Sequence, residues 1–394
     1  MKVLLLGVGM QGKAALFDLF NNPEVSQIVA ADMDKQILQQ HINKCGFQSK
    51  ATATSVDAAS REELERLMDN EVDVVIDLLP PMFVGQVAAA ALAKGIPVVN
   101  TFYAVPEVKD LDLAAKRKGV SILPEFGMDP GIDLVLLGEA VRSLDTVEEV
   151  MSYGAGFPEP AAADNPIKYK VTWTFEGVLK SYKRAGRIIE NGILVDIPAD
   201  EMFAEKNIHQ LKIDGLGELE AFPNGDVMKY VELLHLDSTK LQKMGRFVLR
   251  WSGHCAFWRT MVGMGLLDDG TVNVDGVEVD RKKYLSNALQ EQLQYKSHER
   301  DVVLVRIEVV GKKRGKKVRS VYQIVDKRDL NTGITAMSRT VGFTAAIGAT
   351  LLGSGKLKKK GVLSPVKDIP YELFKQELAT RGIIITATTS EIVT

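Results

Sequence analysis

The stretch Val3-Leu4-Leu5-Leu6-Gly7-Val8-Gly9-Met10-Gln11-Gly12 joins an apolar run to three glycines at fixed spacing, and it decides the fold. An apolar run that ends at a glycine predicts a buried strand turning directly into a helix. In such a turn Gly7 allows the tight bend, Gly9 lets a pyrophosphate approach the backbone, and Gly12 lets the helix pack closely on the strand. The sequence therefore predicts a dinucleotide site at residues 7–12, with the helix N-terminus facing the phosphates.

A carboxylate follows at the position where this kind of site needs one. Asp32 ends the apolar run of residues 28–31 and lies twenty positions after Gly12. A carboxylate there accepts hydrogen bonds from the ribose hydroxyls and repels a 2′-phosphate. The next residues, Met33 and Asp34, offer no arginine for such a phosphate. The sequence therefore predicts NAD as the cofactor in preference to NADP.

Further positions are candidates for contact with the cofactor. Asp57 either lies at the adenine edge of the site or is a surface residue before a helix that starts near Ser60, and both interpretations are open. Leu79 and Pro80 end the strand expected at residues 73–79, at the edge where doubly wound sheets bind ligands. A rigid turn at Pro80 is compatible with that contact.

Residues 1 to about 130 alternate β-rich runs with helical segments, which is the pattern of a parallel sheet with helices on both faces. Apolar residues recur at helical spacing in residues 11–20 and 83–94. The expected strands are residues 2–6, 27–31, 73–79, 96–100 and 120–123. We therefore predict an α/β fold with a Rossmann-type doubly wound parallel sheet.

The character of the chain changes after Gly131, where the expected strands become longer and alternate. Residues 302–310 and 318–325 predict an antiparallel hairpin. Its basic connection, residues 311–317, predicts a solvated turn and not a nucleic-acid patch, because it contains no aromatic residue. Residues 338–352 are small, apolar and glycine-rich, as in a helix packed closely against a sheet.

The bulk composition points to a small-molecule partner. The 394 residues include 49 Lys and Arg against 51 Asp and Glu, so no overall field attracts nucleic acid or a membrane surface. Cys45 and Cys255 have no neighbouring cysteine or paired histidine, so neither a disulfide nor a metal site is predicted. A reducing, cytoplasmic compartment fits this pattern. No apolar run is long enough for a membrane span, and none resembles a signal peptide.

Residues 124–133 form a turn after the last expected strand of the sheet. Asp129, or with less weight Glu125, is positioned to hold an ammonium group or to take part in proton transfer. The Asp-Pro-Gly sequence is also an ordinary turn signal, so a purely structural role is the alternative.

The segment Gly127-Met128-Asp129-Pro130-Gly131-Ile132 resembles the Gly-Leu-Asp-Pro-Gly-Ile motif of the saccharopine dehydrogenase family, in the branch that contains saccharopine reductases and lysine 6-dehydrogenases. Other segments resemble family motifs in the same order. They are residues 100–103 (Asn-Thr-Phe-Tyr), 165–173 (Asn-Pro-Ile-Lys-Tyr-Lys-Val-Thr-Trp), 248–254 (Val-Leu-Arg-Trp-Ser-Gly-His), 361–365 and 381–383. The resemblance thus covers nearly the whole chain.

The resemblance implies a nucleotide domain that is discontinuous in sequence, made of residues 1–130 and 338–394. It implies a second, mixed α/β domain for substrate binding and oligomerisation at residues 131–337, and a homodimer. The implied reaction oxidises an amine C–N bond of an amino acid to an imine with hydride transfer to the cofactor, or runs in reverse.

The resemblance also implies site residues. By position, Tyr103, Asp129, Trp173 and Arg250 match segments that contact the substrate, and Asp129 and Lys170 are the candidates for catalysis. An amine must lose a proton before its carbon can release hydride, so a base or a water chain is required. Arg250 or Lys170 would bind the substrate α-carboxylate, the arginine in bidentate fashion. The alternatives are a solvent-facing charge for Arg250 and core packing for Trp173.

The substrate is inferred from one departure from the family pattern. In saccharopine reductases the segment resembling residues 222–226 carries an arginine, associated with a substrate carboxylate, where this chain has Gly225. Saccharopine has two carboxylates that lysine lacks, so lysine is the expected substrate unless another cation, such as Lys229, takes over the role. The alternatives are a saccharopine reductase, another opine-type or polyamine-linked enzyme, and a protein that senses NAD without catalysis.

Overall fold

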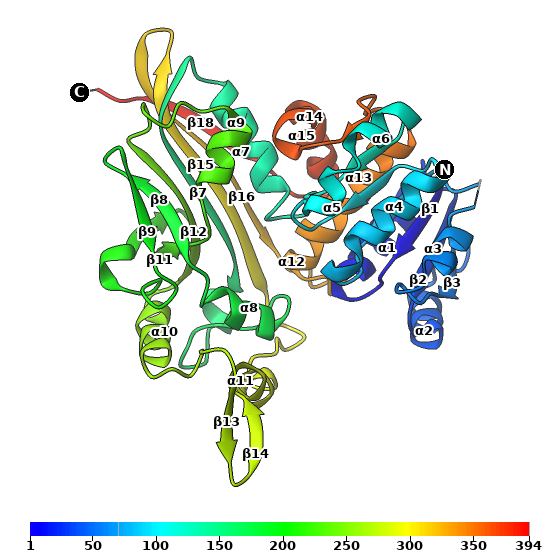
Figure 1. The fold of residues 1–394 in the computed structure, drawn as a ribbon, viewed down its shortest axis with the longest axis horizontal. Helices are drawn as coiled ribbons and strands as arrows, with labels where there is room; N and C mark the ends of the chain where they lie inside the picture. Colours follow the sequence, from blue (N-terminus) through cyan, green and yellow to red (C-terminus); the bar gives the residue numbers. More distant parts are fainter. Residues whose placement is uncertain (70, 394) are drawn as a thin grey trace. The chain divides into compact units, whose positions relative to one another are not determined.

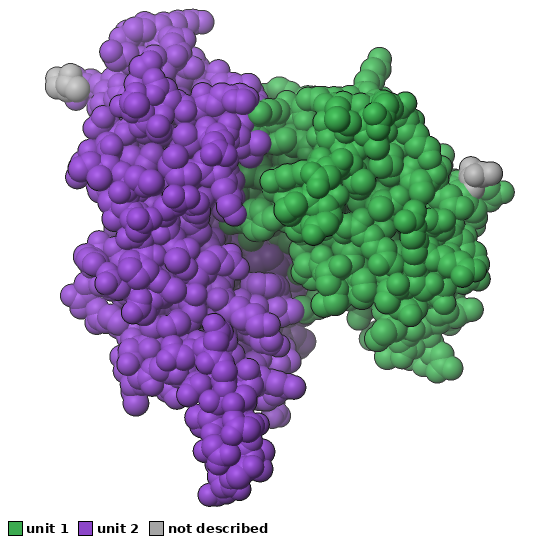
Figure 2. Space-filling model, viewed as in Figure 1, with its two compact units in different colours: residues 1–138, 338–384 green, residues 139–337, 385–394 purple. Residues whose placement is uncertain are grey.

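The computed structural model describes residues 1–69 and 71–393, which form two compact units (Figure 2). Unit 1 comprises residues 1–138 and 338–384, and unit 2 comprises residues 139–337 and 385–394. The predicted boundaries differ in two places. Unit 1 extends past residue 130 because helix α7 (Ile132–Arg142) begins inside it. The last ten residues, predicted in the nucleotide domain, belong to unit 2 because strand β18 (Thr386–Glu391) pairs with β16 (Lys316–Lys327) of that unit.

Unit 1 is built on a seven-stranded parallel sheet with helices on both faces (Figure 1). Its strand order is β17-β6-β5-β4-β1-β2-β3. The strands are β1 (Lys2–Leu6), β2 (Gln27–Asp32), β3 (Ala51–Ser55), β4 (Val74–Asp77), β5 (Val98–Asn100), β6 (Ser121–Leu123) and β17 (Gly361–Val362). The order 3-2-1-4-5-6 is that of the dinucleotide-binding doubly wound fold, so the predicted fold class is confirmed.

Local signals set the helix ends in unit 1. Helix α2 (Lys35–Cys45) begins after Asp34, whose carboxylate accepts hydrogen bonds from the backbone N–H groups of Gln36 and Ile37, and it ends at Gly46 in the left-handed conformation. The other described helices and helical turns of unit 1 are α1 (Met10–Asn21), α3 (Arg61–Leu67), η1 (Pro81–Phe83), α4 (Val84–Lys94), α5 (Pro106–Lys109), α6 (Asp112–Lys118), η4 (Arg339–Phe343), α13 (Thr344–Gly353), α14 (Pro365–Asp368) and α15 (Tyr371–Thr380). The short helix α12 (Ala336–Ser338) contains residues of both units.

The C-terminal segment of unit 1 packs against its first helix and its sheet. A Cβ atom on Gly342, in η4, would lie 2.5 Å from the carbonyl oxygen of Gln11, and one on Gly348, in α13, would lie 2.6 Å from the ring of Phe126. Neither distance is attainable by a real side chain, so only glycine permits both approaches. The glycine-rich helix expected near residues 338–352 thus lies against the sheet, and β17 extends the sheet beside β6.

Unit 2 contains a nine-stranded mixed sheet with the order β10-β11-β12-β7-β15-β16-β18, in which β8 pairs with β12 and β9 with β8. Only β12 and β7 run parallel within it. Its strands are β7 (Thr146–Pro158), β8 (Gly186–Glu190), β9 (Ile193–Ile197), β10 (His209–Ile213), β11 (Gly217–Pro223), β12 (Lys243–Trp251), β15 (Asp301–Lys313), β16 and β18. A mixed α/β second domain is therefore confirmed.

The predicted hairpin is present as β15 and β16, but the basic turn is shorter than predicted. The two strands pair as far as Lys313 and Lys316, which leaves only Arg314 and Gly315 at the turn. The lysines of residues 311–317 therefore extend the ends of two strands, where charged side chains are common.

Unit 2 has an aromatic core to which helices α8 (Phe175–Ser181) and α10 (His254–Gly263) contribute buried side chains. The other described helices that lie within this unit are α9 (Met228–Leu234), α11 (Arg281–Gln290) and the single turns η2 (Pro160–Ala162) and η3 (Glu205–Asn207). The core includes the buried side chains of Tyr169, Phe175, Tyr182, Phe203, Phe222 and Trp258. A separate two-stranded ribbon, β13 (Thr271–Val274) with β14 (Val277–Asp280), projects from this unit (Figure 1).

Candidate functional site

The glycine-rich turn between β1 and α1 has the shape that the sequence predicts. Gly7 has φ +83°, and a Cβ atom on it would lie 2.6 Å from the carbonyl oxygen of Leu78. A Cβ atom on Gly12 would lie 2.1 Å from the carbonyl oxygen of Gly7, whereas one on Gly9 would have no atom within 4 Å. Packing therefore requires the first and third glycines, and the second leaves open space at the uncapped N-terminus of α1. This arrangement fits the pyrophosphate of a dinucleotide.

Asp32 is tied directly to this turn. Its Oδ2 atom accepts a 2.6 Å hydrogen bond from the backbone N–H of Val8, and its Oδ1 atom accepts one of 2.7 Å from that of Met33. Each carboxylate oxygen keeps capacity for a second hydrogen bond. The carboxylate is thus oriented by the backbone before any ribose hydroxyl arrives. Within the predicted turn, Val8 is buried, whereas the Met10 side chain is half exposed.

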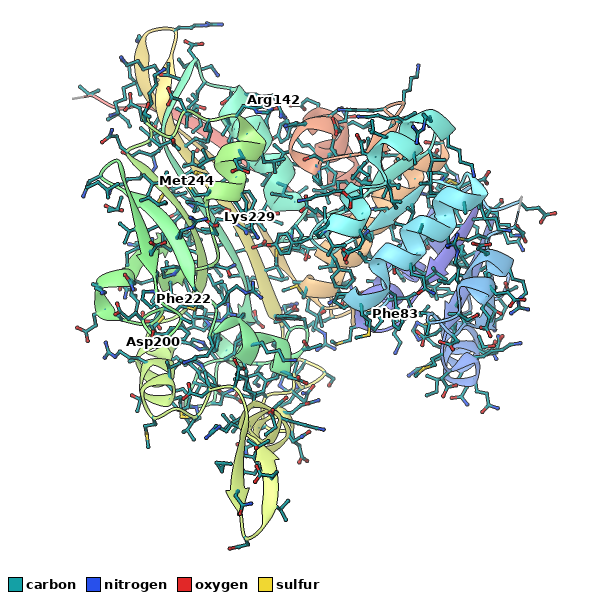
Figure 3. The ribbon with its side chains drawn as sticks, in the orientation of Figure 1. Phe83, Arg142, Asp200, Phe222, Lys229 and Met244 are labelled. Carbon is teal, nitrogen blue, oxygen red and sulfur yellow. The ribbon has the colours of Figure 1, made fainter. Side chains whose placement is uncertain are left out.

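The other predicted cofactor contacts make local interactions. The carboxylate of Asp57 accepts a 2.9 Å hydrogen bond from the backbone N–H of Ala59, which forms a turn before α3. Strand β4 ends at Asp77 and not at the predicted residue 79, so the buried Leu79 lies two positions after it. Pro80 precedes the helical turn η1, which ends at Phe83 (Figure 3). The turn roles of Asp57 and Pro80 are therefore realised, and contact of these residues with the cofactor stays a prediction.

Tyr103 and Asp129 come together although they are 26 positions apart. The hydroxyl of Tyr103 donates a 3.2 Å hydrogen bond to Oδ1 of Asp129. Tyr103 follows β5 and Asp129 follows β6, and these parallel strands are neighbours. Both residues therefore lie at the carboxyl edge of the sheet, the same edge at which Gly7 follows β1 and Asp32 ends β2.

One acidic residue at this edge escaped the sequence analysis. Asp77 ends β4, and only 1% of its surface is exposed. Its Oδ1 atom accepts a 3.1 Å hydrogen bond from the backbone N–H of Leu79, whereas Oδ2 has no partner among the described residues. Burial raises the pKa of this carboxyl to about 7. The available signal was an aspartate inside the apolar run Val74-Val75-Ile76-Asp77-Leu78-Leu79.

Arg250 is buried in unit 2 beside the ring of Tyr169, so the alternative of a solvent-facing charge is wrong. Its guanidinium carbon lies 5.0 Å from the centroid of the Tyr169 ring, and Nη1 donates a 2.8 Å hydrogen bond to the carbonyl of Leu249. The Nε–H group has no partner, and no described carboxylate pairs with this cation. A buried cation without an anion is costly, which makes it a candidate to bind one.

His254, at the start of α10, is a buried neutral side chain. Its Nδ1 lies 3.1 Å from the carbonyl oxygen of Ile167, and its Nε2 lies 2.7 Å from the hydroxyl of Tyr182. Because a carbonyl only accepts, Nδ1 carries the proton and Tyr182 donates to Nε2. Burial, together with the charge of Arg250, lowers the pKa of His254 to about 3. This histidine is therefore a packing residue and not a proton-transfer group.

Lys170 and Trp173 occupy different environments. The Nζ atom of Lys170 is buried and lies 2.7 Å from a carboxylate oxygen of Glu299 and 2.9 Å from one of Asp164. An ammonium held by two carboxylates lacks the lone pair that a base needs, so this geometry favours a structural role over the predicted catalytic one. Trp173 is 41% exposed, with its ring against Gly177 of α8, so it is not a core residue.

Within residues 1–69 and 71–393, no three His, Cys, Asp or Glu side chains gather in a way that would hold a metal ion. None of the helices in the described part of the chain combines the length and apolarity that a membrane crossing requires.

Two family models match consecutive parts of the chain. Residues 3–123 match the model described as Saccharopine dehydrogenase NADP binding domain, and residues 127–383 match the model described as Saccharopine dehydrogenase C-terminal domain. Unit 1 therefore contains a pyridine-nucleotide-binding domain.

Named relatives are similar over most of the chain. The Bos taurus protein named alpha-aminoadipic semialdehyde synthase, mitochondrial, is 25% identical over 447 residues, which cover 98% of this chain and 47% of that protein. The chain thus spans about half the length of this relative. Saccharopine dehydrogenase (NADP(+), L-glutamate-forming) from Saccharomyces cerevisiae is 24% identical over 431 residues, which cover 92% of this chain and 93% of the yeast protein.

A solved structure shares the fold. Apo histidine-tagged saccharopine dehydrogenase (L-Glu forming) from Saccharomyces cerevisiae superimposes with a TM-score of 0.87 at 22% identity, and the match covers 99% of both chains. The resemblance in fold therefore extends through both units.

Proposed function

This chain belongs to the saccharopine dehydrogenase family of oxidoreductases, and from that premise we propose that it is an NAD-dependent amino-acid dehydrogenase that oxidises an amine C–N bond. One observation carries the proposal. The glycine-rich turn, Asp32 and the Tyr103–Asp129 pair all lie at the carboxyl edge of one parallel sheet. Ligands of doubly wound sheets bind at this edge.

The preference for NAD rests on the charges around the ribose position. Asp32 is fixed there by two backbone amides, and Asp34 adds a second carboxylate that caps α2. Both would repel a 2′-phosphate. The yeast relative is named for NADP(+), so the proposed cofactor is a departure within the family. Lys35 is the first residue of α2 and directly follows Asp34. Its positive charge would attract a 2′-phosphate and so oppose the preference for NAD.

Replacing Asp32 with serine and Met33 with arginine is expected to shift the ratio of kcat/KM for NAD over NADP toward NADP by about 10- to 100-fold. The change removes a repulsive charge and supplies a charge-assisted hydrogen bond worth about 1.5–3 kcal/mol. Initial rates with each cofactor measure the ratio. The Met33→Arg variant alone serves as the control for the added charge. A wild-type protein that used NADP better than NAD would contradict the assignment.

The proposed chemistry assigns separate tasks to the chain's own residues. When bound, the nicotinamide ring supplies the hydride acceptor. An ammonium substrate must first lose a proton so that the nitrogen lone pair can form the imine. We assign Asp129 to accept the hydrogen bond of the amine and to take up its proton directly or through water. Tyr103 donates to Asp129 and so fixes the direction in which this carboxylate points.

Arg250 is the proposed group for the substrate carboxylate. Arg250 is buried beside Tyr169 and Tyr182 and has no carboxylate partner among the described residues. A carboxylate would form a charge-assisted pair with the guanidinium and satisfy its free Nε–H group. Lys170 has no part in this proposal because two carboxylates already hold it.

The proposed substrate is lysine, because the turn between β11 and α9 carries Gly225 at the position where saccharopine reductases carry an arginine. Gly225 has φ +75°, and a Cβ atom on it would have no atom within 4 Å. The neighbouring Arg187 is neutralised by an ion pair with Asp226. Lys229 is exposed on α9, whereas Phe222 lies buried in β11 on the other side of the turn (Figure 3). The absence of an arginine at Gly225 supports a substrate without the two additional carboxylates of saccharopine.

We expect kcat/KM for lysine to exceed that for saccharopine by about 100-fold, since an unpaired, desolvated carboxylate costs about 2–3 kcal/mol. Gly225→Arg should narrow this ratio by supplying the absent cation. Gly225→Ala is the matched control, because it carries the same strain at positive φ without the charge. A clear wild-type preference for saccharopine would contradict the lysine assignment and leave the family and the cofactor site intact.

Saccharopine oxidation is the second candidate function, favoured by the names of the relatives. Enzymes acting on other opines or on polyamines, and an NAD sensor without catalysis, are the remaining alternatives. Reduction of NAD measured across lysine, saccharopine, ornithine and diamines separates them. Binding of NAD without reduction by any amine would favour the sensor. The homodimer and the cytoplasmic location stay predictions.

A further inference from the structure

Asp77 occupies an unusual place for a carboxyl group. It ends β4, with β1 and β5 paired on either side, and it lies level with Leu6 and Asn100 in the two ladders. None of these neighbours carries a charge. The carboxyl is buried, one of its oxygens accepts a single backbone hydrogen bond, and the other has no partner among the described residues.

Among the described residues, no charged side chain faces this carboxyl from the elements packed against β4. The titratable residue of β1 is Lys2, at the opposite end of the strand, where it pairs with Asp69. The titratable residue of α4 is Lys94, in its last turn, and β5 and α13 have none. Burial of the carboxylate form is therefore uncompensated, and the neutral form is favoured.

The residues next to Asp77 form one wall of the glycine-rich turn. The backbone N–H of Leu78 donates a 2.8 Å hydrogen bond to the carbonyl of Leu6, the last residue before the turn. The carbonyl of Leu78 lies 2.6 Å from the position that a Cβ atom on Gly7 would occupy. If Asp77 were ionised, its negative charge would therefore lie beside the turn that fits an anionic pyrophosphate. This charge would add to that of Asp32, which is hydrogen-bonded to the same turn.

We propose that Asp77 is protonated when the dinucleotide is bound, so that cofactor binding takes up a proton at this buried carboxyl. The proposal rests on the dinucleotide site described above. The phosphates raise the electrostatic cost of ionising a carboxyl that has no cationic partner nearby. A pKa of about 7, set by burial, gives the free protein a mixture of both forms near neutral pH. Binding selects the neutral form, so affinity is highest below this pKa and falls as the pH rises through it.

Isothermal titration of the full-length protein with NAD tests this linkage. Titrations from about pH 6 to about pH 9, in buffers of different ionisation enthalpy, report both the Kd and the protons taken up. We expect the Kd to rise by up to about tenfold across this range, which corresponds to one pKa unit of coupling. The phosphodiesters of NAD do not titrate in this range. Part of one proton should be taken up near neutral pH.

Asp77→Asn should bind NAD with a nearly pH-independent Kd and without the proton uptake. Asp77→Ser is a second variant, smaller than the aspartate, in case asparagine disturbs the turn. Asp110→Asn changes an exposed carboxylate of the same unit and should keep the wild-type pH profile. A wild-type Kd that does not change with pH, or the same pH dependence in both Asp77 variants, would overturn the proposal. Absence of NAD binding at every pH would overturn the proposed function as well.

Discussion

Replacing Arg250 with methionine is expected to lower kcat/KM for lysine by about 10³-fold while leaving the affinity for NAD unchanged. The loss follows from removing a desolvated guanidinium from a carboxylate, which costs about 4 kcal/mol in the transition state. Arg250 lies in unit 2, whereas the glycine-rich turn and Asp32 belong to unit 1. Initial-rate kinetics and NAD titration therefore report separate parts of the proposed function.

The stability of this variant distinguishes a binding role from a structural one. Arg250 has no described carboxylate partner, so its charge opposes folding, and methionine retains much of its volume. Thermal unfolding should be unchanged or shift upward. Arg259→Met, which removes an exposed guanidinium paired with Glu205, is the matched control and should leave kcat/KM near the wild-type value.

Substrate choice adds a second check on Arg250. A diamine that lacks a carboxylate should react at the same low rate with the wild-type protein and with Arg250→Met. Equal loss of activity toward lysine and toward the diamine would show that Arg250 acts on something other than the carboxylate.

The neutral His254 accepts the hydrogen bond of Tyr182 and so holds the Tyr182 hydroxyl in place beside the guanidinium of Arg250.

The fold of unit 1 was predictable because its determining signals are local. Gly7, Gly9 and Gly12 specify a backbone geometry, and the carboxylate at Asp32 follows at a fixed interval. Strand β3 was missed because Ala51-Thr-Ala-Thr-Ser55 is a short edge strand with few apolar residues. The assignment of β18 to unit 2 depends on its pairing with β16, which is far away in sequence.

Tyr103 and Asp129, both taken from segments that resemble family motifs, lie together at neighbouring strand ends, and their roles in a site stay predictions. The roles of other residues depend on distant partners. Lys170 was a catalytic candidate because it lies in a segment that resembles a family motif, and nothing local revealed its pairing with Glu299, 129 positions later. The environment of Asp77 is set by the neighbouring strands β1 and β5, so the sequence showed an apolar run but not an isolated carboxyl.

Replacing Arg381 with methionine is expected to lower the free energy of unfolding of unit 1 by about 3–5 kcal/mol. Arg381 follows α15 and forms two hydrogen bonds, of 2.6 and 2.9 Å, with the carboxylate of Asp18 in α1. Both side chains are about nine-tenths buried. Loss of the arginine leaves Asp18 buried without a cation, and it releases the contact that joins the end of the chain to the first helix.

Chemical denaturation without ligand measures this loss, because bound NAD would stabilise the folded unit by mass action. Lys375→Met is the matched control: it removes an exposed ion pair with Glu372 on α15, and it should change stability by less than about 0.5 kcal/mol. Adding Asp18→Leu to Arg381→Met should recover part of the loss, because the uncompensated charge is then gone.

Equal unfolding midpoints for the wild-type protein and Arg381→Met would contradict the view that this pair ties residues 338–384 to the rest of unit 1. Since α1 begins at the glycine-rich turn, the same variant should also weaken NAD binding, whereas Lys375→Met should not.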